Sequence, residues 1–101
     1  HIIRWVVNLQ ISFNDMKSNV VIIDIRATNE YEEFHYPNSV CIPRLTLLKC
    51  PDEYLNKVDE YYLICHKGEV SLSCSRILNA LGYHCYSVEG GIEKYKNSIK
   101  I

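Results

Sequence analysis

The sequence predicts an α/β fold with an open, mostly parallel sheet and helices on both faces. Apolar runs rich in β-branched residues, such as residues 20–25, are typical of strands buried on both sides of a parallel sheet. Segments with a helical spacing of apolar residues alternate with these runs, which indicates strand–helix–strand units. With 101 residues, of which 48% are hydrophobic, the chain can build a core of its own. We therefore expect a single domain over residues 1–101.

The expected strands are short apolar runs that end in polar or turn residues. The first run includes Trp5, and the run at residues 61–64 is uninterrupted, as in a strand at the centre of a sheet. Residues 35–38 are expected to form a turn, because Pro37 disfavours helical backbone in the residue before it. The strands predicted in this way are residues 4–11, 20–25, 39–42, 61–64 and 85–88.

Capping residues indicate where two of the helices start. Ser12 is followed three residues later by Asp15, an arrangement similar to a capping box, which predicts a short helix from Ser12. Thr28 or Asn29 is expected to cap the next helix, and Glu32 stands at the third position after Asn29.

Further helices are predicted in the second half of the chain. Pro51 fits the first position of a short helix that runs to about residue 58. The clearest helical pattern spans residues 71–81, with Gly82 as its stop. The residues expected on one apolar face of this helix are Leu72, Ile77, Leu78 and Leu81. After a turn at residues 90–91, the apolar residues of a terminal helix are Ile92, Tyr95 and Ile99.

Cys65 directly follows the strand expected at residues 61–64. In open α/β sheets, ligands bind at the carboxyl ends of the strands, where this residue falls. The loop after it contains Gly68, whose backbone can take a positive φ, and leads into a helix. Inward-pointing loop N–H groups and the amino end of a helix favour an anion, here the reactive thiolate. Taken alone, these residues fit a buried structural cysteine equally well.

Several segments between residues 20 and 95 resemble the rhodanese homology domain, in the order in which that family carries them. An apolar strand ends in Asp-x-Arg, a segment similar to "EYxxGHIPGAxNIP" follows, then the cysteine loop, then an ending similar to "LGY…LEGGI". These segments are residues 21–26, 30–43, 63–71, 81–83 and 88–92.

This resemblance implies the family's α/β fold and a sulfurtransferase of the thiosulfate:cyanide type. Cys65 would be the catalytic nucleophile, carrying a sulfane sulfur as a persulfide. The donor would be thiosulfate, a polysulfide or a persulfide, including a protein-bound one, and the acceptor a thiol or cyanide, with no cofactor and no metal. The residues of the implied anion-binding loop are His66, Lys67, Gly68, Glu69, Val70 and Ser71.

The chain departs from the family pattern in its loop and in one turn. Family members that use thiosulfate often carry an arginine where His66 or Val70 stands, and Glu69 adds a negative charge. A doubly charged donor should therefore be held weakly, which favours persulfide or polysulfide donors. Phe34 and Asn38 replace the family's usual glycines, so this turn must be built differently.

Other polar residues near the expected site allow a functional and a structural interpretation. Lys67 supplies a positive charge at the mouth of the loop or is a solvated surface lysine. His66 can donate a hydrogen bond or simply be exposed. Asp24 and Arg26 are interpreted as structural, with Arg26 pairing a glutamate of the following helix. The glycines of residues 89–91 are expected to form a second rim that lets a partner approach closely.

Other functions of the same fold stay as alternatives. A cysteine phosphatase needs an arginine at the sixth position after the cysteine, where this chain has Ser71, and its loop appears one residue longer. Arsenate reduction would also need a loop arginine. A non-catalytic rhodanese-like binding or regulatory module generally lacks the cysteine, which is present here as Cys65.

Composition and cysteine spacing exclude further classes. The net charge of -1 and the lack of a Lys/Arg cluster give no indication of nucleic-acid binding, and no apolar stretch is long enough to span a membrane. The five cysteines form no C-x-x-C pair, so neither a zinc site nor a thioredoxin-like motif is expected. Cys41, Cys74 and Cys85 are interpreted as core residues in a reducing compartment, which predicts a cytoplasmic protein.

Overall fold

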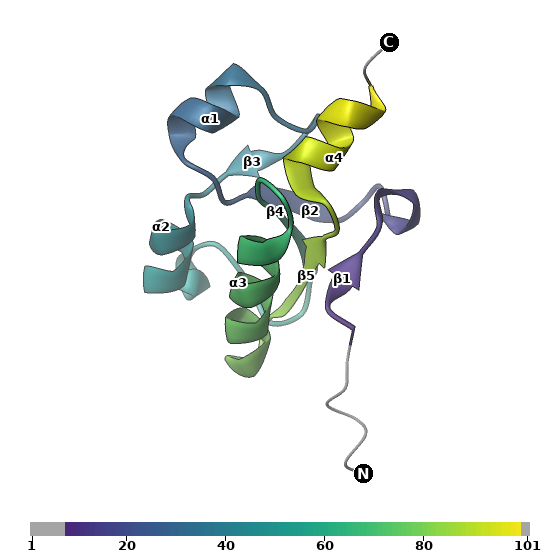
Figure 1. Cartoon of the computed structure of the whole chain (residues 1–101). Coiled ribbons are helices and arrows are strands. Elements are labelled where there is room, and N and C mark those ends of the chain that lie inside the picture. The colour runs from purple at the N-terminus through teal and green to yellow at the C-terminus, as the bar shows by residue number, and fades with distance from the viewer. Residues whose placement is uncertain (1–7, 100–101) are drawn as a thin grey trace.

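A computed structural model, which describes residues 8–99, shows a five-stranded sheet with the order β1-β5-β4-β2-β3 (Figure 1). Every paired strand runs parallel to its neighbour, so the carboxyl ends of all strands lie at one edge. The predicted open, mostly parallel sheet is confirmed. The strands are β1 (Gln10–Ile11), β2 (Val21–Asp24), β3 (Val40–Cys41), β4 (Glu60–Ile64) and β5 (His84–Val88).

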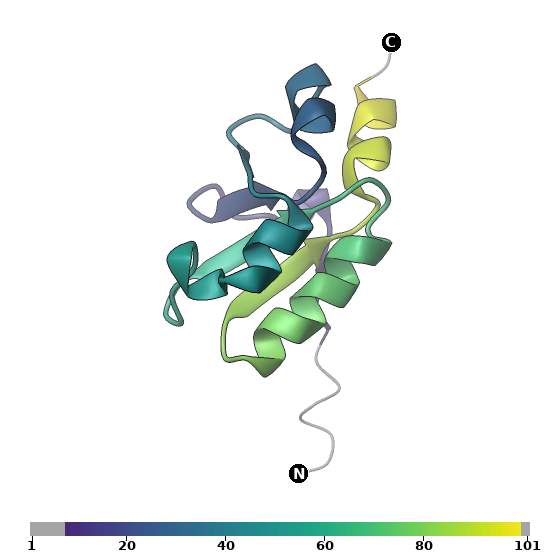
Figure 2. The same cartoon turned by 90° about the vertical axis from the view of Figure 1, so that its left-hand side faces the viewer.

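Helices cover both faces of this sheet, as predicted (Figures 1 and 2). On one face, α2 and α3 pack through Leu47 and Leu78 against Ile23 and Leu63 of the sheet. On the other face, α4 packs through Ile92. The helices are α1 (Thr28–Glu33), α2 (Arg44–Lys49), α3 (Glu69–Ala80) and α4 (Gly91–Ser98), with short 3-10 helices at η2 (Phe13–Asp15) and η3 (Pro51–Glu53).

The central strand β4 explains why residues 61–64 form an uninterrupted apolar run. Side chains alternate across a strand, so Tyr61 and Leu63 enter the core under α2 and α3, while Tyr62 and Ile64 enter the core under α4. All of them are at least 95% buried. A strand with a covered face on each side has no solvent-facing position and therefore shows no polar alternation.

Helix α3 differs from its prediction in its start and in its buried face. It begins at Glu69 rather than residue 71, because Gly68 at φ 100° takes the N-cap position. The predicted apolar face was wrong for Ile77 and Leu81, which are 46% and 51% exposed. The buried residues are Ser71, Cys74, Ser75 and Leu78. Gly82 follows the helix at φ 103°, as predicted for its stop.

The first part of the chain corrects three predictions. Of the strand expected at residues 4–11, the described part is residues 8–11, and within it only Gln10–Ile11 form a strand, β1; residues 4–7 lie outside the described range. The short helix after Ser12 is present as η2, but the Ser12 hydroxyl donates to the Asp15 carboxylate instead of capping the backbone. Ala27 is the N-cap of α1, where Thr28 or Asn29 was predicted.

Two further elements in the middle of the chain differ from their predictions. Helix α2 was not predicted, and the helix starting at Pro51 ends at Glu53 rather than near residue 58. The turn before β3 is where it was expected, at Pro37 and Asn38. Asn38 adopts φ 68°, so asparagine supplies left-handed backbone at a position where the resemblance implied a glycine.

The predicted core cysteines fall into two groups. Cys74 and Cys85 are buried, as predicted, and burial raises the pKa of their thiols to about 11 and about 12. Cys41 is only half-buried, which corrects its placement in the core, and its thiol donates to the Arg26 carbonyl oxygen at 3.7 Å. None of the helices within residues 8–99 has the length and apolar content needed to cross a membrane.

Candidate active site

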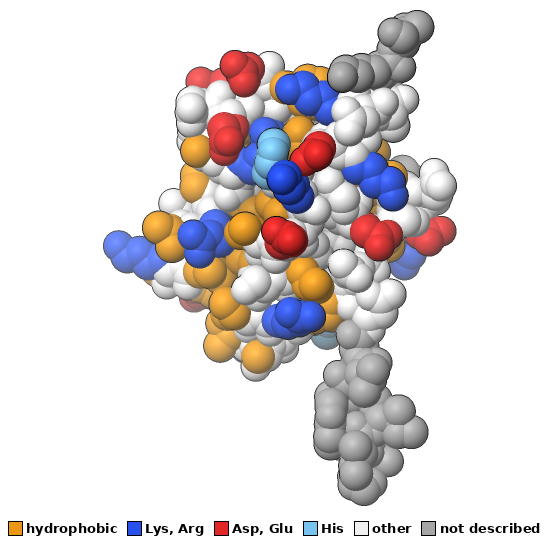
Figure 3. Space-filling view, viewed as in Figure 1, with side chains coloured by type: hydrophobic (Ala, Val, Ile, Leu, Met, Phe, Trp, Pro, Cys, Tyr) orange, Lys and Arg blue, Asp and Glu red, His pale blue; other side chains and the backbone are white. Residues whose placement is uncertain are grey.

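Cys65 lies at the carboxyl edge of the sheet, immediately after β4 and in front of α3 (Figure 1). Its residue surface is only 4% exposed, because the loop folds around the sulfur. Figure 3 shows acidic, basic and histidine side chains gathered over the start of α3, with hydrophobic side chains over α2 and the rest of α3 below. Charged side chains therefore surround the loop that covers the sulfur.

The loop places two backbone donors on the Cys65 sulfur. The N–H of Gly68 donates to Sγ at 3.1 Å, and the N–H of Ser71 donates to the same atom at 3.2 Å. The left-handed backbone of Gly68 makes this possible, because it turns the chain back over the sulfur before α3 begins. Such converging N–H groups form a cradle that suits an anionic sulfur.

The implied loop residues divide into those that contact the sulfur and those that face solvent. Gly68 and Ser71 are buried against it. His66 is exposed, and its Nε2 lies 4.0 Å from a carboxylate oxygen of Glu93 on α4. The other exposed loop residues are Lys67, Glu69 and Val70.

A pair of buried serine hydroxyls lies behind the sulfur. The Cys65 thiol donates to Ser71 Oγ at 3.2 Å, and Ser71 Oγ lies 2.6 Å from the hydroxyl oxygen of Ser87 on β5. The sequence pattern did not single out Ser87. One signal was available: Ser87 lies between an aromatic and an aliphatic residue of a strand that was predicted to be buried. A buried hydroxyl group needs a hydrogen-bond partner, so such a serine indicates a polar contact.

The amino end of α4 supports the loop from the opposite side. The N–H groups of Ile92 and Glu93 donate to the carbonyl oxygens of Cys65 and His66, both at 2.9 Å. A Cβ atom on Gly91 would lie 2.5 Å from the Cys65 carbonyl oxygen. The glycines here were expected to let a partner approach closely. In the structure, the backbone of the cysteine loop itself makes this close approach to Gly91.

Asp24 and Arg26 form a buried ion pair at the end of β2, in agreement with their structural interpretation. Arg26 Nη2 lies 2.9 Å from Asp24 Oδ2, and the side chains are 9% and 0% exposed. The guanidinium also donates to the Phe34 carbonyl oxygen at 2.6 Å. Arg26 therefore pairs with Asp24 instead of the helix glutamate that was predicted. The pair ties β2 to the end of α1.

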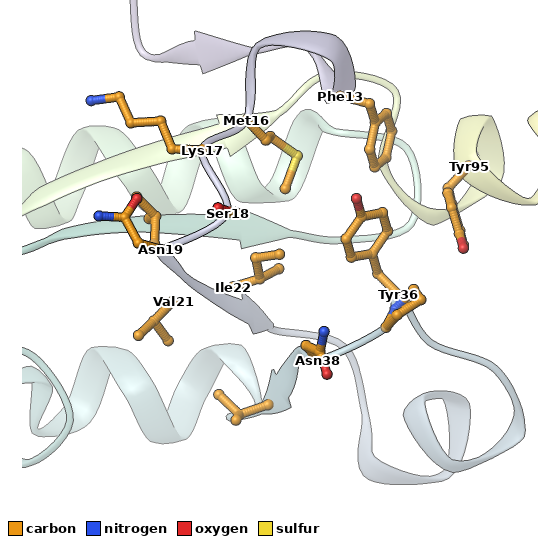
Figure 4. A pocket seen from close by; sticks show the side chains of 13 residues that line it. Phe13, Met16, Lys17, Ser18, Asn19, Val21, Ile22, Tyr36, Asn38 and Tyr95 are labelled. Carbon is orange, nitrogen blue, oxygen red and sulfur yellow. The ribbon is translucent and has the colours of Figure 1, made fainter.

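Clefts lie on both sides of the loop. One of about 300 Å³ opens between α1 and α4 beside His66 and Glu93. Another of about 350 Å³ lies along α2 and α3 beside Val70. A larger cleft of about 600 Å³ lies between η2 and the turn before β3. It is lined by aromatic and aliphatic side chains and by polar ones such as Lys17 and Asn19, but by no cysteine or histidine (Figure 4). Cys65 and its loop are thus the candidate site.

Known proteins are similar to this chain in sequence and in fold. The model of the rhodanese-like domain matches residues 11–98. YrkF of Bacillus subtilis, named as a sulfur carrier protein, is 38% identical over 69 residues, which are 68% of this chain and 37% of that protein. Uba4 of Ogataea parapolymorpha, named as an adenylyltransferase and sulfurtransferase, is 35% identical over 80 residues, which are 77% of this chain and 20% of that protein. The chain thus spans a minor part of the length of these two relatives.

Solved structures show the same architecture. A rhodanese-related protein of Thermoplasma volcanium matches 91% of this chain and 94% of its own, with a TM-score of 0.79 and 26% identity. A rhodanese-like domain protein of Staphylococcus aureus matches 83% of this chain and 87% of its own, with a TM-score of 0.71 and 29% identity. With the family match over residues 11–98 and this shared fold, the chain belongs to the rhodanese-like domain family.

Proposed function

We propose that this chain is a sulfurtransferase in which Cys65 carries a sulfane sulfur as a persulfide. The observation that carries the proposal is the position of Cys65 Sγ, which accepts the N–H groups of Gly68 and Ser71 at 3.1 and 3.2 Å. Converging donors stabilise a thiolate, and the thiolate is the form that attacks sulfur. Membership of the rhodanese-like family supports the same conclusion.

The proposed reaction consists of two displacements at sulfur. The Cys65 thiolate attacks the outer sulfur of a donor R–S–SH, so that a new S–S bond forms at Cys65 and the donor leaves as R–S⁻. The outer sulfur of the resulting persulfide is then attacked by the acceptor, a thiolate or cyanide. The bond between that sulfur and Cys65 breaks, and the electron pair returns to Sγ. Electrons balance in each step without a cofactor or metal.

The charges around the loop favour persulfide or polysulfide donors over thiosulfate. Val70 and His66 occupy places where an arginine would hold a doubly charged anion, and Glu69 adds an exposed negative charge. Lys67 is a single exposed cation. A protein-bound persulfide also fits, since relatives of this chain are named as a sulfur carrier and as sulfurtransferases. The free cysteines among the described residues fit the reducing, cytoplasmic location that we propose.

Intact-mass measurement tests the proposed function. The protein is incubated with thiosulfate and, separately, with polysulfide, and then digested to locate any added sulfur. We expect one added sulfur atom on the peptide that contains Cys65, with greater loading from polysulfide. Loss of the added sulfur on treatment with cyanide or a thiol would demonstrate transfer.

A non-catalytic binding or regulatory module is the second candidate. It predicts no sulfur gain with either donor, although the fold and the loop would be unchanged. A sulfur gain at a different cysteine would also overturn the proposed role of Cys65. The phosphatase and arsenate reductase alternatives lack the loop arginine on which they depend, because Ser71 stands in its place.

A further inference from the structure

Ser71 and Ser87 are two fully buried hydroxyl groups joined to each other and to Cys65. Ser71 lies in the first turn of α3 and Ser87 lies in β5, and both are 0% exposed. Their oxygens are 2.6 Å apart, and Ser87 also donates to the Gly68 carbonyl oxygen at 3.1 Å. Because no solvent reaches these groups, their hydrogen bonds are made only with one another and with the loop.

When Cys65 is a thiol, its proton and the two hydroxyl protons form one chain of donors. The thiol donates to Ser71, Ser71 donates to Ser87, and Ser87 donates to the Gly68 carbonyl oxygen. Each proton has an acceptor, and each hydroxyl oxygen receives a donor. The neutral thiol is therefore fully accommodated.

When Cys65 is a thiolate, the same atoms allow the chain to reverse. The Ser71 hydroxyl rotates to donate to Sγ, and the Ser87 hydroxyl donates to Ser71 in place of Gly68. The Gly68 carbonyl oxygen still accepts the N–H of Leu72 at 3.2 Å. The thiolate then has a hydroxyl donor besides the two N–H groups, and that donor is polarised by the hydroxyl behind it.

We propose that Ser87 is a positioning residue for Cys65: acting through Ser71, its hydroxyl stabilises the thiolate over the thiol. This role rests on the proposed function, because it concerns the charge state that the sulfur needs for attack. In the thiol state, Ser71 without Ser87 can still donate to the Gly68 carbonyl oxygen at 3.3 Å. In the thiolate state, its oxygen would receive no donor. Removal of Ser87 thus weakens the thiolate selectively.

Other ionisable groups around the loop also influence the charge of the sulfur, but substitution of Ser71 or Ser87 leaves all of them in place. They come from the loop, from α3, from α4 and from the end of β2, and none is changed. These groups are His66, Lys67, Glu69, Cys74, Glu93 and the pair Asp24 and Arg26.

The test measures thiolate formation at Cys65 in the full chain, by two methods that do not need sulfur transfer. One is the ultraviolet absorbance of the thiolate against pH, taken as the difference between each protein and its Cys65→Ser counterpart. The other is the rate of iodoacetamide labelling against pH, located to Cys65 by mass spectrometry. The proteins are the wild type, Ser71→Ala, Ser87→Ala and the double variant.

We expect Ser87→Ala to raise the pH midpoint of both curves by about half a unit, and Ser71→Ala by about one unit. In the Ser71→Ala background, Ser87→Ala should add nothing further, because its action passes through Ser71. Ser75→Ala is the matched control: Ser75 is also 0% exposed and lies on α3, but its Oγ has no hydrogen-bond partner within the described structure. Its midpoint should equal that of the wild type.

Equal midpoints for Ser87→Ala and the wild type would overturn the proposal, as would a full additional shift in the double variant. If Ser87→Ala fails to fold, Ser87→Cys takes its place: a thiol has nearly the same shape but is a weak donor, so the labelling midpoint located to Cys65 should still lie above that of the wild type. Sulfur loading of the wild type is scored separately. A shifted midpoint without loading removes the proposed function alone, and loading without a shift removes the positioning role alone.

Discussion

Gly91 and Cys65 are in backbone contact across the start of α4 and the end of β4. A Cβ atom on Gly91 would lie 2.5 Å from the Cys65 carbonyl oxygen, and the glycine adopts φ 61°. Gly91→Ala should therefore displace the loop and cost about 2–3 kcal/mol of unfolding free energy through strain and lost hydrogen bonds. Urea unfolding measures that cost, and intact-mass measurement should show reduced sulfur loading.

Gly82→Ala is the matched control for this change. Gly82 also has a positive φ, of 103°, but an added Cβ would meet only the flexible side chain of Lys57, at 3.3 Å. We expect a loss of stability with sulfur loading retained. Equal loading by the Gly91 and Gly82 variants would show that the backbone contact does not hold the loop in its active form.

Cys65→Ser should abolish sulfur loading and leave the fold intact. A serine oxygen can accept the same N–H groups from Gly68 and Ser71, but it forms no stable persulfide. Sulfur loading is measured by intact mass and folding by the thermal midpoint of unfolding. Cys50→Ser is the control, because Cys50 is a half-buried cysteine outside the loop and its loss should leave loading unchanged. Retained loading in Cys65→Ser would move the nucleophile elsewhere, with Cys74 the next candidate.

Arg26→Ala should be strongly destabilising, by about 3 kcal/mol or more. It leaves the carboxylate of Asp24, which is 0% exposed, without its charged partner. Lys17→Ala is the contrasting change, because Lys17 and Glu60 form an exposed pair at 3.5 Å, and its effect should stay within about 0.5 kcal/mol. Urea unfolding of both variants makes the comparison. Similar losses would contradict the assigned importance of the buried pair.

Val70→Arg should lower the Michaelis constant for thiosulfate about tenfold and leave polysulfide use nearly unchanged. Val70 is 47% exposed in the first turn of α3, so an arginine fits there, and its charged fork matches sulfonate oxygens. Lys67→Ala should weaken thiosulfate use more than polysulfide use. Val58→Arg adds the same charge at an 86% exposed position before the amino end of β4. If Val58→Arg lowers the Michaelis constant for thiosulfate as much as Val70→Arg does, a charge in the loop is not what selects the donor.

The stability of the protein should fall as the pH rises above 9. Burial raises the pKa of Cys74 from 9.0 to about 11 and that of Cys85 to about 12, so the unfolded chain loses these protons first. The stabilisation is complete below pH 9; it is lost toward pH 11 for Cys74 and toward pH 12 for Cys85, at up to about 1.4 kcal/mol per pH unit for each thiol. Urea unfolding from pH 8 to 10.5 should show a flatter curve for the Cys74→Ala and Cys85→Ala double variant than for the wild type.

The sequence predicted the sheet well because its strands bury apolar residues. The run at residues 61–64 enters two cores and can be interpreted without knowledge of its neighbours. The buried face of α3 could not be predicted in the same way. This helix packs on β4 and β5, and its buried residues include the small Ser71, Cys74 and Ser75, whereas the spacing of large apolar side chains pointed to the half-exposed Ile77.

Only the part of the candidate site whose residues are neighbours in the sequence was predicted. Cys65, the left-handed Gly68 and the amino end of α3 follow one another along the chain, so their arrangement could be inferred. Ser87 and Ile92 reach the site from β5 and α4, through contacts that no local pattern encodes. Hydrogen bonds between distant segments depend on the sheet order, which brings β5 beside β4.

The contact between α4 and the cysteine loop also determines how often the site opens. The amides of Ile92 and Glu93 are bonded to the carbonyl oxygens of Cys65 and His66, so these amide protons exchange with water only when that contact breaks. The hydrogen-exchange rates of these two amides therefore measure how often the contact between α4 and the loop opens. Local opening of the eight-residue helix α4 would break both hydrogen bonds and release the cysteine loop while the sheet stays folded.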